Sequence, residues 1–146
     1  MIDTHCHLDF EEYKDNLDDI ILDCKKNNIN KIINPGSSVK RSQVGFSNSQ
    51  KYDCVYFACG SHPGEVCDEE NIKKLNDNKD FKLADPLRPY EDIKNDINEV
   101  FTKLIEDKKC VAIGEIGLDY NFINYILPNS SEVNINKIKE LQKELF

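Results

Sequence analysis

The chain has 146 residues, of which 39% are hydrophobic and 32% are charged, a composition typical of a folded protein with one domain-sized core and not of a disordered chain. The formal net charge of −8 argues against a protein that binds nucleic acid through a broad basic surface. No apolar run approaches the length of a membrane span, and polar Asp3 and His5 stand where a signal peptide would need apolar residues. We therefore expect an intracellular protein, cytoplasmic or nuclear, with no membrane partner.

Segments with β-strand character alternate along the chain with segments of helical periodicity. The expected strands are residues 1–7, 31–36, 55–63 and 110–120, and the expected helices are 15–28, 38–51 (the weakest pattern), 90–108 and 134–146. This alternation predicts an α/β fold with a parallel sheet, as in doubly wound sheets and in (β/α)8 barrels. No glycine-rich phosphate loop follows the first strand, which disfavours the doubly wound nucleotide-binding fold. The first four βα units of a TIM barrel fit better, because barrel enzymes keep site residues at the carboxyl ends of several strands.

The stretch from residue 66 to residue 89 is polar and long for a connection between a strand and a helix. We interpret it as a surface insertion within a single domain of residues 1–146. A short helix is expected inside it, at 69–76.

His5 and His7 are two of only three histidines in the chain and lie two residues apart in the first expected strand. Side chains at positions i and i+2 of a strand point to the same face, so both imidazoles can converge on one divalent ion. Asp3 lies on that face one step earlier, where it can orient a ligand as a neighbouring carboxylate or hold the local structure. Taken alone, the two histidines can equally be a pair that happens to lie at a strand end.

Glu115 directly follows the last apolar strand and is flanked by Gly114 and, two residues on, Gly117. Glycines allow a ligand to approach the backbone closely, and the two oxygens of a glutamate can each bind one cation. The alternative for Glu115 is a solvent-exposed turn residue. For Asp119, four residues later, we favour a structural role, in which its carboxylate accepts hydrogen bonds from nearby backbone N–H groups.

His62 stands between Ser61 and Pro63 at the end of the third expected strand. Its imidazole could ligate a metal ion, contact a phosphate or accept a hydrogen bond within a turn. We favour a contact in the catalytic pocket over direct ligation, so His62 joins Glu115 as a candidate catalytic residue.

The three motifs DTHCHLD, GSHP and GEIGLDY, in this order, resemble those of the TatD family of metal-dependent deoxyribonucleases. The resemblance implies a TIM barrel of the metal-dependent hydrolase class that cleaves phosphodiester bonds of DNA, as an exonuclease. It also implies one or two divalent ions, Mg²⁺, Mn²⁺ or Zn²⁺. Carried over to this chain, His5 and His7 are similar to the ligands of the first ion, and Glu115 to the carboxylate that bridges both ions.

The chain departs from the family pattern in two ways. The stretch 66–89 is longer than usual, and no histidine follows His62, although the family takes two more histidines and an aspartate from later strands. We therefore expect weak metal binding and little nuclease activity from the chain as given, with the C-terminal half of a barrel as a possible partner and a dimer of two half-barrels as a lesser alternative. A related amidohydrolase acting on amides or lactones, or a non-catalytic remnant with an interaction role, are the competing functions.

Overall fold

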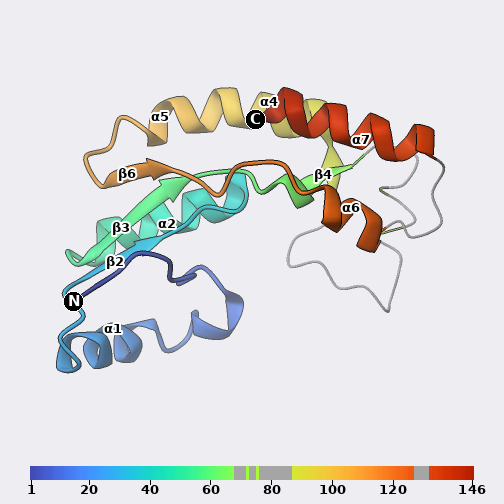
Figure 1. Cartoon of the computed structure of the whole chain (residues 1–146). Coiled ribbons are helices and arrows are strands. Elements are labelled where there is room, and N and C mark those ends of the chain that lie inside the picture. The colour runs from blue at the N-terminus through green and yellow to red at the C-terminus, as the bar shows by residue number, and fades with distance from the viewer. Residues whose placement is uncertain (68–71, 73–74, 76–86, 127–131) are drawn as a thin grey trace. The chain divides into compact units, whose positions relative to one another are not determined.

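The computed structural model describes the whole chain except residues 68–71, 73–74, 76–86 and 127–131 (Figure 1). Its residues form two compact units. Unit 1 comprises Met1–Ser61 and Val100–Glu115, and unit 2 comprises His62–Glu99 and Ile116–Phe146. Each unit is therefore built from two separate stretches of the chain.

Unit 1 contains a four-stranded parallel sheet with the strand order β1-β2-β3-β6. The strands are β1 (Ile2–Asp3), β2 (Lys31–Asn34), β3 (Val55–Cys59) and β6 (Cys110–Ile113). The predicted α/β fold with parallel strands is thus confirmed. The regular strands are shorter than the sequence indicated, and the polar residues expected at their ends lie in the segments that follow them.

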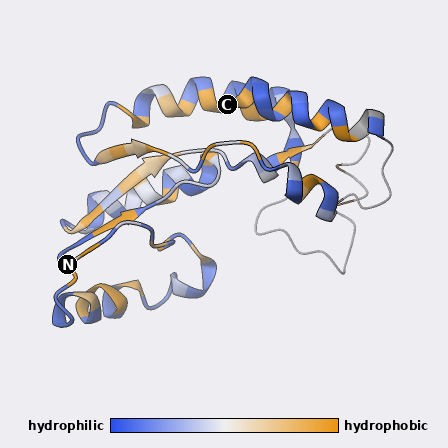
Figure 2. Ribbon diagram, viewed as in Figure 1, coloured by the Kyte–Doolittle hydropathy of each residue, from blue (hydrophilic) through white to orange (hydrophobic). Residues whose placement is uncertain are grey.

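Helices α1 (Leu17–Lys26) and α2 (Val39–Lys51) belong to unit 1 and connect its first three strands. Both form where the sequence predicted a helix. α1 carries acidic residues in its first turn and lysines in its last, which complements the helix dipole. α2 begins at Ser38, whose side chain accepts a hydrogen bond from the backbone N–H of Arg41 at 3.0 Å. Figure 2 shows hydrophobic residues along the strands and alternating hydrophobic and hydrophilic residues around α1.

The core of unit 1 lies between the sheet and these helices. One cluster of buried residues joins the start of the chain and α1 to β2 and β3, and a second surrounds Phe57 and Cys59 of β3; the clusters contain Leu8, Leu17, Ile21, Ile32 and Val55, and Phe57, Cys59 and Leu104. α2 lies close to β3 where it carries small residues. At Gly45, an added Cβ atom would lie only 3.2 Å from the Cβ atom of Phe57. A separate apolar hollow of about 140 Å³ is lined by residues from all four strands: Ile2, Lys31, Ile33, Tyr56 and Val111.

A continuous helical segment runs from unit 2 into unit 1 over residues 90–104. It consists of α4 (Tyr90–Asp96), a π-helical turn (Ile97–Phe101) and α5 (Thr102–Leu104). The sequence predicted this helix to residue 108. It ends earlier because Asp107 forms the turn into β6, where its backbone oxygen accepts from Cys110 N–H and its carboxylate from Lys109 N–H.

Unit 2 contains a parallel pair of two-residue strands, β4 (Val66–Cys67) and β5 (Arg88–Pro89), together with α6 (Tyr120–Ile126) and α7 (Glu132–Leu145). The stretch 66–89 therefore begins and ends in paired strands. Val66, Cys67 and Leu87 are buried. The polar surface insertion expected over 66–89 stays a prediction, because most of that stretch lies outside the described residues. Most of the short helix expected at 69–76 lies outside the described residues. No helix in the described part of the chain is long and apolar enough to cross a membrane.

Candidate metal centre

His5 and His7 lie just beyond the regular part of β1, where the chain still follows β2. The N–H of Cys6, between them, donates to the backbone oxygen of Ile33 at 3.1 Å. The two imidazoles remain on one side of the chain, with ring centroids 5.1 Å apart and an angle of 77° between their planes. Asp3 accepts a hydrogen bond from the backbone N–H of His5 at 3.1 Å, so its carboxylate orders the turn that carries the first histidine.

Glu115 follows β6, which forms the opposite edge of the same sheet from β1. Its Oε1 lies 3.3 Å from Nε2 of His5, and its Oε2 lies 3.9 Å from Nε2 of His7. One possible ligand atom from each of the three side chains lies within 4.8 Å of the other two. The structure therefore brings together the three residues that the sequence predicted as metal ligands.

The donor set fits a divalent ion. Two atoms that each lie about 2.1 Å from one ion are about 3.0–3.4 Å apart in octahedral or tetrahedral geometry, close to the separation of His5 and Glu115. Two imidazoles and a carboxylate suit several divalent metals, so these residues do not select one. The His5 side chain is 59% exposed, whereas those of His7 and Glu115 are 20% and 27% exposed, so an ion would be reached from the His5 side.

Cys6 lies between the two histidines but is a poor metal ligand. Burial, with a smaller contribution from the charge of Asp3, raises the pKa of its thiol to about 11. Because metals bind the thiolate and not the thiol, a protonated Cys6 leaves ligation to its two neighbours.

Asp9 is a site residue that the sequence analysis missed. Its carboxylate is completely buried, and Oδ1 lies 3.4 Å from Nδ1 of His7. Nδ1 is itself buried and makes no hydrogen bond within the described part of the chain, so a small adjustment would let it donate to Asp9. A carboxylate on one imidazole nitrogen leaves the lone pair of the other nitrogen, here Nε2, free for a metal ion. The only sequence signal for this role is an acidic residue two positions after His7.

Two partners from later in the chain hold Asp9. Arg41 of α2 donates from Nη1 to Oδ2 at 2.6 Å, and Asn34 of β2 donates from Nδ2 to Oδ1 at 2.9 Å. Phe10, the next residue, stacks on the ring of His7 with centroids 4.8 Å apart and planes 11° apart. His7 is therefore oriented by both a buried carboxylate and an aromatic face.

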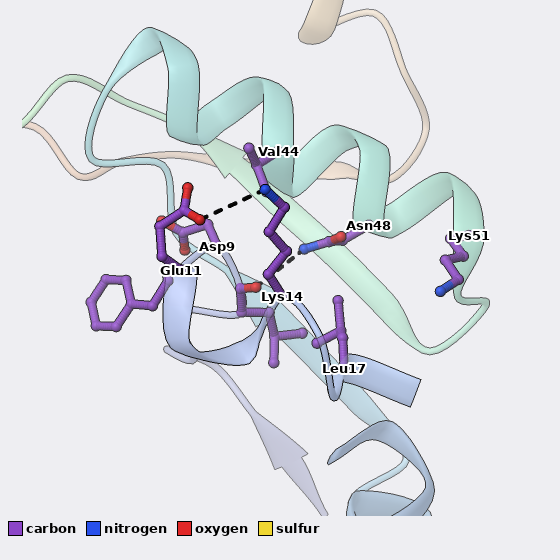
Figure 3. Close-up of a pocket in the computed structure, with 9 residues that line it drawn as sticks. Asp9, Glu11, Lys14, Leu17, Val44, Asn48 and Lys51 are labelled. Carbon is purple, nitrogen blue, oxygen red and sulfur yellow. Dashed lines mark hydrogen bonds and ion pairs between the residues drawn. The ribbon is translucent and has the colours of Figure 1, made fainter. Parts of the chain in front are cut away.

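Asp9 also lines a pocket of about 290 Å³ between residues 8–17 and α2 (Figure 3). The pocket includes charged side chains, among them Lys14, which pairs with Glu11 at 3.8 Å. None of the three candidate ligands lines it, so this pocket is distinct from the metal centre and touches it only through Asp9.

His62 and Asp119 belong to unit 2, and each caps the start of a helical segment. Nδ1 of His62 accepts a hydrogen bond from Gly64 N–H at 3.0 Å, which starts the short 3-10 helix Pro63–Glu65. Oδ1 of Asp119 accepts from Phe122 N–H at 2.8 Å at the start of α6. Neither residue is among the three that cluster as candidate ligands.

The sequence model of the TatD related DNase family matches residues 2–146. The chain belongs to this family. The relatives of this TatD-family chain include the uncharacterized metal-dependent hydrolase YabD of Bacillus subtilis, which is 26% identical over 148 residues that cover 100% of this chain and 43% of YabD. Human deoxyribonuclease TATDN3 is 25% identical over 122 residues, covering 83% of this chain and 39% of TATDN3.

The fold of the TatD-family chain matches that of a solved relative, the TatD homologue YjjV of Escherichia coli K12. The TM-score is 0.59 at 21% sequence identity, and the match covers 99% of this chain and 46% of YjjV. The parallel α/β architecture therefore corresponds to part of a TatD-type TIM barrel, as the sequence predicted. The chain spans less than half the length of these relatives.

Proposed function

We propose that this TatD-family chain carries part of the centre of a divalent-metal-dependent hydrolase that cleaves phosphodiester bonds of DNA. The observation that carries the proposal is the convergence of His5, His7 and Glu115, which come from opposite edges of one sheet. The name of the human relative, deoxyribonuclease TATDN3, supports DNA as the substrate, and the name of YabD supports metal-dependent hydrolysis.

The roles of the residues follow from their contacts. His5 and His7 would hold an ion through Nε2, and Glu115 would offer one oxygen to the side of each histidine, an arrangement that suits a bridging carboxylate. A bound divalent ion lowers the pKa of a water molecule and neutralises charge that develops on phosphate. Asp9 keeps His7 in the orientation in which Nε2 faces Glu115.

His62 has a separate proposed role as a substrate contact. Since its Nδ1 already accepts from Gly64 N–H, the neutral ring carries its proton on Nε2. That N–H can donate to a phosphate oxygen. Asp119, whose carboxylate caps α6, has a structural role in this scheme.

We further propose that the three ligands bind an ion weakly and that exonuclease activity requires ligands from the C-terminal half of a barrel. The chain supplies no histidine after His62, and its relatives are more than twice as long as the region they share with it. The chain by itself should therefore show metal binding without efficient cleavage.

Calorimetric titration of the chain with Zn²⁺ and with Mn²⁺ tests the metal centre. Binding should disappear in His5→Ala/His7→Ala, weaken in Glu115→Gln, and persist in Glu106→Gln, an exposed glutamate of the same unit. A 3′-labelled DNA oligonucleotide, incubated with the same proteins, reports cleavage. Binding that is equal in all four proteins would contradict the proposed centre, and rapid cleavage by the Glu115→Gln variant would contradict its role in hydrolysis.

A further inference from the structure

The backbone of Glu115 is hydrogen-bonded to the segment that follows β2, although β2 is not adjacent to β6 in the sheet. β6 pairs with β3, yet beyond the regular strands the N–H of Glu115 donates to the backbone oxygen of Gly36, after β2, at 2.6 Å. The N–H of Gly36 donates in return to the oxygen of Gly114 at 3.2 Å, and the N–H of Gly114 donates to Cys59 at 2.7 Å. The segments after β2 and β6 therefore meet directly, across the end of β3.

Gly60, the residue directly after β3, makes this meeting possible. A Cβ atom at position 60 would overlap the backbone nitrogen of Glu115 and the carbonyl group of Gly114. These are backbone atoms, which cannot rotate away as the end of a long side chain can. Any residue other than glycine at position 60 would therefore push the peptide of Glu115 away from Gly36.

Ser42 of α2 fixes Gly60 from the helix side. The serine is completely buried, and its Oγ accepts a hydrogen bond from Gly60 N–H at 3.2 Å. The same Oγ lies 2.8 Å from the backbone oxygen of Ser38 and 3.3 Å from that of Gly60, so its hydroxyl can donate to either. The N–H and the C=O of Gly60 thus both contact the side chain of Ser42. These contacts hold the backbone of Gly60 in place, and the peptide between Gly114 and Glu115 packs directly against it.

We propose that Ser42 and Gly60 are positioning residues that hold the carboxylate of Glu115 opposite His5 and His7. The inference rests on the proposed metal centre. It adds two residues that do not bind the metal ion themselves but hold the backbone of the ligand Glu115. In the GSHP motif, the glycine then serves the metal centre of unit 1, whereas the histidine caps a helix in unit 2.

Two matched pairs of variants test the inference. Ser42→Ala is compared with Ser49→Ala, because Ser49 is equally buried in the same helix but its hydroxyl contacts Phe46 and Gln50 of that helix and not Gly60. Gly60→Ala is compared with Gly45→Ala, which also adds a methyl group to a closely packed glycine but places it against Phe57 of β3 and not against Gly114 or Glu115. Each protein is titrated with Zn²⁺, and amide hydrogen exchange of Glu115 is measured by NMR in the metal-free state.

Gly60→Ala should weaken Zn²⁺ binding about 10- to 100-fold, the range typical of groups that orient metal ligands. Ser42→Ala should act in the same direction by a smaller factor. Both should accelerate exchange of the Glu115 amide relative to amides in β2, while Ser49→Ala and Gly45→Ala should leave the exchange of Glu115 at the wild-type rate.

Unchanged exchange of the Glu115 amide in Ser42→Ala and Gly60→Ala would overturn the inference. If Gly60→Ala does not fold, Ser42→Ala decides the result by itself. If the wild-type chain binds no Zn²⁺, the proposed metal centre fails, and the exchange rates in the metal-free protein still show whether Ser42 and Gly60 position Glu115.

Discussion

Replacement of Arg41 by methionine should destabilise the chain substantially, because it leaves the carboxylate of Asp9 buried without its cationic partner. The side chain of Asp9 is completely buried and that of Arg41 is only 11% exposed, and their nearest charged atoms are 2.6 Å apart. Loss of one partner from a buried ion pair costs about 3–5 kcal/mol. Asn34 still donates to Asp9 in the variant, so a loss of about 3 kcal/mol in the free energy of unfolding is expected.

Urea denaturation followed by circular dichroism in the presence of a chelator measures this loss, since the chain contains no tryptophan. The double variant Asp9→Asn/Arg41→Met should be at least about 1 kcal/mol more stable than Arg41→Met, because the buried charge is then absent. Lys26→Met, which breaks the exposed pair of Lys26 with Asp23, should change stability by less than about 0.5 kcal/mol. A loss below about 1 kcal/mol in Arg41→Met, or a double variant less stable than Arg41→Met, would refute the reasoning.

Three further predictions concern single side chains. Asp9→Asn should weaken Zn²⁺ binding about 10- to 100-fold by calorimetry and change the ¹⁵N shifts of His7 that report its tautomer; unchanged shifts would contradict the role of Asp9. Burial, with a smaller contribution from Cys110, raises the pKa of Cys59 from 9.0 to about 12, so its thiol form favours the folded state. The difference in free energy of unfolding between wild type and Cys59→Ala should therefore be constant below pH 9 and decline as the pH rises toward 12. Urea denaturation across this range measures the difference, and an increase with pH would contradict the prediction. Asp119→Ala should destabilise α6 by about 0.5–2 kcal/mol, measured as faster exchange of the Phe122 amide, with Asp119→Asn retaining most of the protection.

The sheet and the three clustered side chains were predictable because their signals are local. Continuous apolar runs mark β3 and β6, and the carboxyl ends of parallel strands meet at one edge of a sheet. Residues placed directly after such strands therefore converge, which brought Glu115 to His5 and His7 although β1 and β6 lie at opposite edges.

Other features depend on partners that no local pattern reveals. Asp9 follows the histidine motif in an irregular segment, and its burial depends on Arg41, far along the chain. α2 had a weak helical pattern because it packs small residues, among them Ser42 and Gly45, against β3. α6 was missed because the expected strand 110–120 ends at Ile113, and a helix of seven residues shows too little periodicity to be recognised.

The interleaving of the two units has a consequence for synthesis of the protein. Residues 62–99 of unit 2 lie between β3 and the last strand of unit 1, so the ribosome makes them before β6 exists. At translation rates of about 5–20 residues per second, β3 would wait about 3–10 s for its partner. During that interval its outer edge has unpaired backbone groups, which other nascent chains could pair with. A delay about twice as long separates the synthesis of His7 from that of Glu115, so a newly made chain has the complete set of three candidate ligands only after β6 has docked.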